Sequence, residues 1–199
     1  MLSPQAAVAA PKRVLTFGDS LSAGYGVQPE EAVPARLEAA LKAKGLDVVV
    51  RDASVSGDTT AGGVVRLNWA LDTFSEGPPD LVVVEFGGND MLRGLDPEHA
   101  RRNLSTILDQ LKERGIPAVL AGMRASPNLG PDYVSRFDAL YGELARKFDV
   151  PLYPFFLEGV AGRPELLQAD GLHPNPQGVE IIVKGLAPVV ADALAAQAK

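Results

Sequence analysis

The 199-residue chain contains no cysteine and only two histidines, His99 and His173. The first absence excludes thiol catalysis and disulfide bonds, and the second excludes a zinc site built from several histidines. No apolar run approaches the roughly 20 residues of a membrane-spanning helix. The net charge of −6 at pH 7 argues against nucleic acid or anionic membranes as partners. With 46% hydrophobic residues, the chain is expected to be globular and long enough to bury a core of its own.

The N-terminal segment has two interpretations. Residues 1–11 include Ala-Val-Ala-Ala, which resembles the end of a signal-peptidase site, but they have no basic region and no adequate apolar stretch. They are therefore either a disordered tail or the remnant of a trimmed signal peptide, with a slight preference for the remnant. Residues 12–199 contain no linker or internal repeat, so we expect them to form a single domain.

Apolar runs alternate with segments of helical periodicity along the chain. The runs predict five strands: Val14–Phe17, Val48–Val50, Leu81–Phe86, Ile116–Ala121 and Val150–Tyr153. Such alternation indicates an α/β fold, in which a parallel sheet has right-handed crossovers and helices on both faces.

The helix signals are clearest in the second half of the chain. Asp96 is expected to cap a helix with Pro97 at its first position, ending near Gly115. The last helix is expected to begin at Pro176 and to be interrupted at Pro188. Three further helices are indicated, one ending at Gly45, one between the second and third strands, and one from about Val134 to Phe148.

The polar clusters of the sequence lie where these strands end. In an open parallel sheet, ligands bind beyond the carboxyl ends of the strands. This rule selects five loops: Gly18–Gly26, Ser54–Thr60, Gly87–Arg93, Gly122–Gly130 and the stretch after Tyr153.

Two of these loops contain the parts of a nucleophilic site. Asp170 and His173 are three residues apart, so the carboxylate could accept the Nδ1–H and leave Nε2 free as a base. Ser20 follows the first strand in a glycine-flanked turn, and a serine hydroxyl needs such a base to become nucleophilic. The alternatives are a histidine that only caps the next helix and Ser22 as a rival nucleophile, although Ser22 is expected to cap the local turn.

Donors for an oxyanion are available in two other loops. Gly57 offers an unshielded backbone N–H, Asn89 offers a side-chain amide, and the backbone N–H of Ser20 could be a third donor. Taken singly, Gly57 and the segment Gly87–Asp90 are also explained as ordinary turns.

Together these segments resemble the four sequence blocks of the GDSL esterases, also called SGNH hydrolases. The blocks are "FGDSLSAGYG", the Gly57 loop, "GGND" and "DGLHP", and the likeness runs from about residue 13 to the final helix. The stretches "VEFGGNDMLRG" and "KFDVPLYPFF" resemble in particular the bacterial branch of thioesterase I, lysophospholipase L1 and arylesterases.

The resemblance implies a role for each matching residue. Ser20 would be the nucleophile, His173 the general base and Asp170 its orienting partner, with Ser20, Gly57 and Asn89 forming the oxyanion hole. It also implies a three-layer α/β/α sandwich of the flavodoxin-like type with a five-stranded parallel sheet. The branch uses two further loops for acyl chains, which implicates five residues as substrate-binding: Met91, Leu92, Pro127, Leu129 and Tyr133.

The expected activity is hydrolysis of carboxylic esters and thioesters without a cofactor or metal. The expected partner is a small ester or thioester, and the chain is expected to be a monomer or a small homo-oligomer. The branch implies a periplasmic or secreted location, with a cytoplasmic one left open. Two other functions are considered, a carbohydrate O-acetyl esterase and a non-catalytic binding module. The single tryptophan, Trp69, offers no evident platform for stacking a sugar.

Four aspartates and the second histidine are given structural roles. The carboxylates of Asp19 and Asp90 are expected to hold loop backbone N–H groups. A metal site formed by Asp52, Asp58 and Asp90 is considered and disfavoured, because it would need convergent oxygen ligands. His99 is expected to be solvated at the start of an exposed helix.

Overall fold

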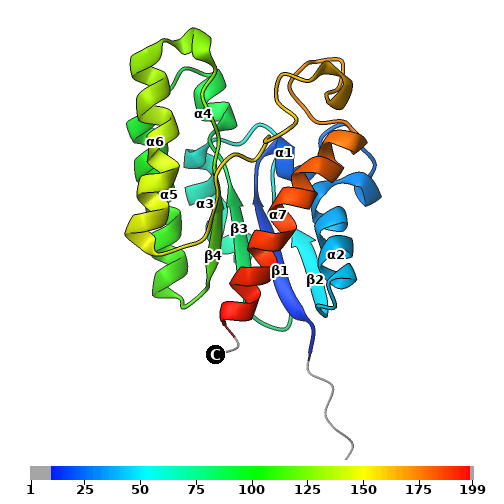
Figure 1. The fold of residues 1–199 in the computed structure, drawn as a ribbon. Helices are drawn as coiled ribbons and strands as arrows, with labels where there is room; N and C mark the ends of the chain where they lie inside the picture. Colours follow the sequence, from blue (N-terminus) through cyan, green and yellow to red (C-terminus); the bar gives the residue numbers. More distant parts are fainter. Residues whose placement is uncertain (1–9, 198–199) are drawn as a thin grey trace, which may run out of the picture.

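The computed structural model describes residues 10–197, so most of the predicted tail, residues 1–9, lies outside the described part. Five strands form one parallel sheet in the order β2-β1-β3-β4-β5 (Figure 1). They are β1 (Lys12–Gly18), β2 (Val48–Asp52), β3 (Leu81–Glu85), β4 (Ala118–Ala121) and β5 (Leu152–Tyr153). The predicted five-stranded parallel α/β sheet is confirmed, although β4 and β5 each begin two residues later than expected.

Helices cover both faces of the sheet and complete the three layers (Figure 1). On one face, α2 (Val33–Ala43) packs against α7 (Pro176–Ala196). On the other, α5 (Pro97–Glu113) packs against both α3 (Thr60–Leu71) and α6 (Pro131–Phe148). Short elements at the strand ends are α1 (Ser20–Ala23), α4 (Gly88–Leu92) and the 3₁₀ turns Pro29–Glu31, Pro127–Leu129 and Pro164–Leu166. Within residues 10–197, none of the helices has both the length and the apolarity needed to cross a bilayer.

The centre of the sheet is apolar because helices exclude water from both of its faces. All five residues of β3 are buried, which agrees with the nearly continuous apolar sequence of this strand. α5 contributes an apolar stripe to the same core, and the N–H of Glu98 donates to the Asp96 carboxylate at its start. The predicted cap at Asp96 is therefore confirmed.

The order of the strands changes direction between β1 and β3, in the middle of the sheet. From β1 the chain goes to β2 on one side, whereas from β3 it goes to β4 on the other. The loops that follow β1 and β3 therefore diverge, and ligands bind at this point in flavodoxin-like sheets.

α7 is continuous from Pro176 to Ala196, so the predicted interruption at Pro188 is wrong. Pro188 lies on the exposed side of the helix and has no N–H for the carbonyl of Lys184. Leu186 and Val190, on either side of it, are fully buried, so packing holds both halves in one helix. Burial of this apolar face thus outweighs the local cost of the proline.

Replacing Pro188 should therefore stabilise the protein. Pro188→Ala restores the missing backbone donor, and the greater freedom of its unfolded chain offsets only part of the gain. We expect the free energy of unfolding to rise by about 1–2 kcal/mol, which corresponds to a Tm increase of roughly 2–8 °C. Lys184→Ala, an exposed substitution one turn earlier, is the control and should change Tm little. A decrease in Tm for Pro188→Ala would contradict this account of α7.

Two carboxyl groups are buried where β1 and β3 end. Glu85, the last residue of β3, is fully buried, and Asp19 follows β1 with 1% of its surface exposed. Burial and the nearby Asp19 carboxylate raise the pKa of Glu85 well above its ordinary value, and burial raises the pKa of Asp19 to about 6. Gly18 leaves room for the Glu85 carboxyl group, because a Cβ at position 18 would lie 2.6 Å from Glu85 Oε2.

The raised pKa of Glu85 predicts a pH-dependent cost to stability. The folded protein keeps a proton that the unfolded chain releases above pH 4.5, so wild-type stability is reduced as the pH rises past that value. Glu85→Gln removes this ionisation and preserves the shape of the side chain. The difference in unfolding free energy, variant minus wild type, should grow by up to about 1.4 kcal/mol per pH unit between about pH 5 and 6. Urea unfolding of both proteins across this range measures it, and a constant difference would contradict the prediction.

Candidate active site

A pocket of about 220 Å³ opens at the carboxyl ends of β1 and β3. The segments that follow all five strands contribute to its wall, which is mostly apolar. Its lining includes Ser20, Gly57, Asn89 and His173, together with Tyr25, Met91, Leu92, Met123, Leu157 and Leu172. The polar residues thus lie together on the wall of an apolar cavity, which is the usual composition of a small-molecule site.

Ser20, His173 and Asp170 form a continuous chain of hydrogen bonds. The distance from Ser20 Oγ to His173 Nε2 is 2.8 Å, and the distance from His173 Nδ1 to Asp170 Oδ2 is 2.7 Å. With Nδ1–H donating to the carboxylate, Nε2 is left to accept the proton of the serine hydroxyl. This arrangement meets the geometric requirement for activating a serine nucleophile.

The Asp170 carboxylate is held by its own loop as well as by the imidazole. Its Oδ1 accepts the backbone N–H groups of Leu172 and His173 at 2.9 and 3.0 Å. The Leu172 N–H, the His173 ring and the His173 N–H lower the pKa of Asp170 to about 2. Asp170 is therefore ionised through mild acid and can orient the imidazole there.

The loop that carries His173 is attached to the loop that carries Ser20. Gln168 Nε2 donates to the backbone carbonyl of Tyr25 at 2.6 Å and to that of Pro174 at 2.9 Å. The Tyr25 ring lies against the imidazole, with 4.6 Å between the ring centroids. Sequence reasoning missed both Gln168 and Tyr25, because their roles depend on contacts between distant loops.

Ser20 begins α1, directly after the residue that caps this short helix. Asp19 Oδ1 accepts the backbone N–H of Leu21 at 3.0 Å. Ser22 was expected to cap this turn, and that prediction is wrong. The Ser22 hydroxyl donates instead to Glu85 Oε2 at 2.9 Å, because it faces the buried carboxyl group and not the pocket.

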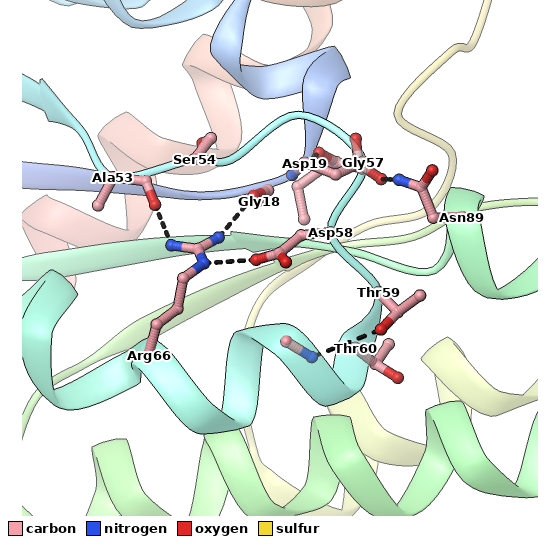
Figure 2. A network of polar contacts seen from close by, with 12 residues as sticks. Gly18, Asp19, Ala53, Ser54, Gly57, Asp58, Thr59, Thr60, Arg66 and Asn89 are labelled. Atoms are coloured by element: carbon pink, nitrogen blue, oxygen red, sulfur yellow. Dashed lines mark hydrogen bonds and ion pairs between the residues drawn. The ribbon is translucent and has the colours of Figure 1, made fainter.

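Gly57 and Asn89 face the pocket from two different loops. Gly57 is the third residue of the turn Val55–Asp58 and has a φ of +83°, a conformation that favours glycine. The Asn89 amide is oriented by Asp19, whose Oδ2 accepts a hydrogen bond from Asn89 Nδ2 at 3.0 Å (Figure 2). The second hydrogen of that amide remains available to a ligand, so the site offers the amide next to the Gly57 backbone.

Two of the five residues expected to bind the acyl group line the pocket, and three are not among its lining residues in the described part of the chain. Met91 and Leu92 line the pocket. Pro127, Leu129 and Tyr133 are not among the residues that line it in the described part of the chain. Pro127 is exposed, Leu129 packs against the core, and the Tyr133 hydroxyl donates to the carbonyl of Leu95.

The remaining aspartates have separate partners. Asp90 is buried and accepts the backbone N–H and the hydroxyl of Thr60, so the predicted structural role is confirmed for it. Asp19 confirms the same prediction through Leu21. Asp58 pairs with Arg66. Asp52 accepts the hydroxyl of Thr16, so Asp52, Asp58 and Asp90 have distinct contacts.

His99 lies on the exposed side of α5, as the sequence predicted. Trp69 is also exposed, and it is not among the residues that line the pocket between residues 10 and 197.

Known proteins that are similar to this chain are named as esterases or thioesterases. An arylesterase of Vibrio mimicus is 44% identical over 172 residues, which cover 86% of this chain and 84% of the relative. Thioesterase 1/protease 1/lysophospholipase L1 of Escherichia coli (strain K12) is 40% identical over 179 residues, covering 90% of this chain and 83% of the relative. The solved structure of AlinE4, an SGNH-hydrolase family esterase, matches with a TM-score of 0.79 and 50% identity, covering 94% of this chain and 98% of that one.

The family match agrees with these relatives. Residues 16–181 match the GDSL-like lipase/acylhydrolase family, and this range includes Ser20, Gly57, Asn89, Asp170 and His173. The match spans most of the sheet and every loop that lines the pocket. The chain therefore belongs to the GDSL-like lipase/acylhydrolase family, the SGNH hydrolases.

Proposed function

We propose that the protein hydrolyses carboxylic esters and thioesters of small acyl or aryl groups through an acyl-enzyme intermediate on Ser20. The observation that carries the proposal is the 2.8 Å contact between Ser20 Oγ and His173 Nε2 on the wall of an apolar pocket. Relatives named arylesterase and thioesterase 1 support both leaving-group classes.

In the first half of the reaction, Ser20 Oγ attacks the carbonyl carbon while His173 Nε2 takes the hydroxyl proton. The carbonyl oxygen becomes negative and accepts hydrogen bonds from Gly57 N–H, Ser20 N–H and the Asn89 amide. His173 then gives its proton to the leaving alkoxide, phenolate or thiolate, and the carbon–oxygen or carbon–sulfur bond breaks. Ser20 is left esterified to the acyl group.

In the second half, water replaces the leaving group. His173 takes a proton from the water, whose oxygen attacks the acyl carbon and forms a second oxyanion in the same cradle. Collapse releases the carboxylic acid, and the proton returns to Ser20 Oγ. The oxyanion hole therefore acts twice in each cycle. Removing one donor from an oxyanion hole typically lowers kcat about a hundred- to thousandfold.

The pocket supports a small or narrow acyl group. Its volume is about 220 Å³, which is below the roughly 300–1,000 Å³ of typical ligand pockets. Met91 and Leu92 line the pocket and belong to the same short helix as Asn89, so we assign the acyl group to this part of the wall. Pro127, Leu129 and Tyr133 could contact only the distal part of a longer chain, so we retain them as an outer extension of the site.

We also propose a periplasmic or secreted location and a single-domain protein that acts as a monomer or small homo-oligomer. The support for the location is the resemblance to the bacterial thioesterase I branch and the Ala-Val-Ala-Ala segment of residues 1–11. Fractionation of cells that express the full chain would test it.

The nucleophile assignment predicts a large loss of turnover in Ser20→Ala. Turnover of p-nitrophenyl esters should fall by at least about a thousandfold, because no other hydroxyl contacts His173 Nε2 among the described residues. Fluorophosphonate labelling should disappear as well, while circular dichroism stays unchanged. Ser22→Ala is the matched control. It should still be labelled, even though loss of the contact with Glu85 lowers its stability. A labelled Ser20→Ala variant would overturn the assignment.

The triad geometry also predicts the pH dependence of kcat/KM. The pKa of Asp170 is lowered to about 2, so its carboxylate is still ionised at pH 4 and cannot cause a loss of activity there. Any loss of activity in acid should therefore follow protonation of a group other than Asp170, with a tenfold decrease per pH unit for a single proton. Asp170→Asn should lower kcat about a thousand- to ten-thousandfold, because the amide no longer holds the imidazole in the required tautomer. A rate that stays constant into acid while the fold persists would contradict a histidine base.

A further inference from the structure

One arginine beneath the site has no part in the mechanism described above. Arg66 lies on α3, and only 14% of its side-chain surface is exposed. Its guanidinium is 4.5 Å from the centroid of the Phe17 ring and 5.5 Å from that of Phe86. Arginine is rarely buried unless its donors are satisfied, so the contacts of this side chain explain its place in the core.

The guanidinium joins three segments that are distant in sequence. Nη2 donates to the carbonyl of Gly18 at 2.8 Å, Nη1 to the carbonyl of Ala53, and Nε to the carboxylate of Asp58 (Figure 2). Gly18 is the last residue of β1, and Ala53 follows β2 directly. A planar guanidinium with five fixed donors can make these contacts together, whereas an ammonium group cannot.

The same contacts determine where the turn that contains Gly57 lies. The turn is closed by a hydrogen bond from Asp58 N–H to the Val55 carbonyl at 3.1 Å. Its first residue is attached to β1, because Val55 N–H donates to the Gly18 carbonyl at 3.0 Å. Its last residue, Asp58, is attached through Arg66 to that same carbonyl. Both ends of the turn are therefore connected by hydrogen bonds to the carbonyl of Gly18, two residues before Ser20.

We propose that Arg66 is a positioning residue for the oxyanion hole, which holds the Gly57 N–H at its working distance from Ser20. The inference rests on the proposed function, because the N–H matters only if an oxyanion forms there. Arg66 is not among the residues that line the pocket in the described chain, so it acts through the turn and not by touching substrate. A displacement of a reacting or stabilising group by about 1 Å can cost a hundredfold in rate.

A second arginine limits the effect to be expected. Arg93 Nη2 donates to the carbonyl of Gly57 at 2.7 Å from the exposed end of α4, the helix that carries Asn89. The turn therefore keeps one external contact when Arg66 is changed. We expect a partial misplacement of the N–H and not its complete removal.

The test is Arg66→Lys, which preserves the positive charge and removes the planar guanidinium that makes the three contacts. Turnover of p-nitrophenyl acetate should show kcat lowered about 10- to 100-fold with KM within about twofold, since the apolar side chains that line the pocket are unchanged. The rate of Ser20 phosphonylation by a fluorophosphonate should fall in parallel, because the phosphonyl oxygen occupies the same cradle. Both are measured well below the Tm of the variant, so that unfolding does not contribute.

Arg51→Lys is the matched control. Arg51 makes the same kind of contacts beyond the other end of α3, with its guanidinium 4.8 Å from the centroid of the Phe74 ring and its Nη1 2.6 Å from the Thr73 carbonyl. This variant should lower Tm, if it has any effect, and leave kcat within twofold of wild type.

Asp58→Ala provides a second variant in case Arg66→Lys does not fold. It releases one end of the turn and should lower kcat about 3- to 10-fold without raising KM, as a fraction of the hundredfold cost of a full displacement. A folded Arg66→Lys or Asp58→Ala protein with wild-type kcat would overturn the proposal, as would a rise in KM alone. Failure of the wild-type protein to react with the fluorophosphonate would instead reject the proposed function.

Discussion

The hydrogen bond between Ser20 and His173 joins residues 153 positions apart, and the rest of the site depends on it. Neither residue is useful by itself, because the hydroxyl is a weak nucleophile and the imidazole needs a fixed orientation. The sheet provides the common frame. β1 presents Ser20 at its carboxyl end, and the loop that follows β5 returns across the same edge with Asp170 and His173. Gln168 then attaches this loop to the backbone of Tyr25.

The same edge of the sheet contains buried polar groups that are costly to stability. Glu85 and Asp19 are both buried where β1 and β3 end, and burial raises the pKa of each. Their hydrogen bonds hold the turn that carries Ser20 and the amide of Asn89. Buried groups with perturbed pKa values often accompany functional sites, and here they hold the Ser20 turn and the Asn89 amide in place.

The two hydrogen-bond donors Asn89 and Gly57 are held by both buried and exposed contacts. The Asn89 amide is oriented from below by Asp19, while the Gly57 turn is held by Arg66 beneath it and by Arg93 at the surface. In the proposed mechanism, the oxyanion meets donors that these contacts hold in place, and donors that need no reorganisation have the greatest catalytic value.

Local sequence was sufficient for the elements of the fold and for the residue types of the site. The apolar run of β3, the cap at Asp96 and the loops at the strand ends were all predicted, because periodicity and capping depend on neighbouring residues. The wrong predictions arose where distant contacts override local preference. α7 continues through Pro188 because its flanking residues are buried, and Ser22 turns inward to Glu85 instead of capping its helix.

The sequence by itself determined that the chain alternates strands and helices, and that a serine, a histidine and several donors lie in loops at one edge of the sheet. Only the tertiary structure decided which of those groups touch, how far apart their atoms lie, and that Arg66, Tyr25 and Gln168 connect the loops. The physical reason is that secondary structure follows from interactions a few residues apart. Hydrogen-bond geometry between loops is defined only when the packed core brings them together.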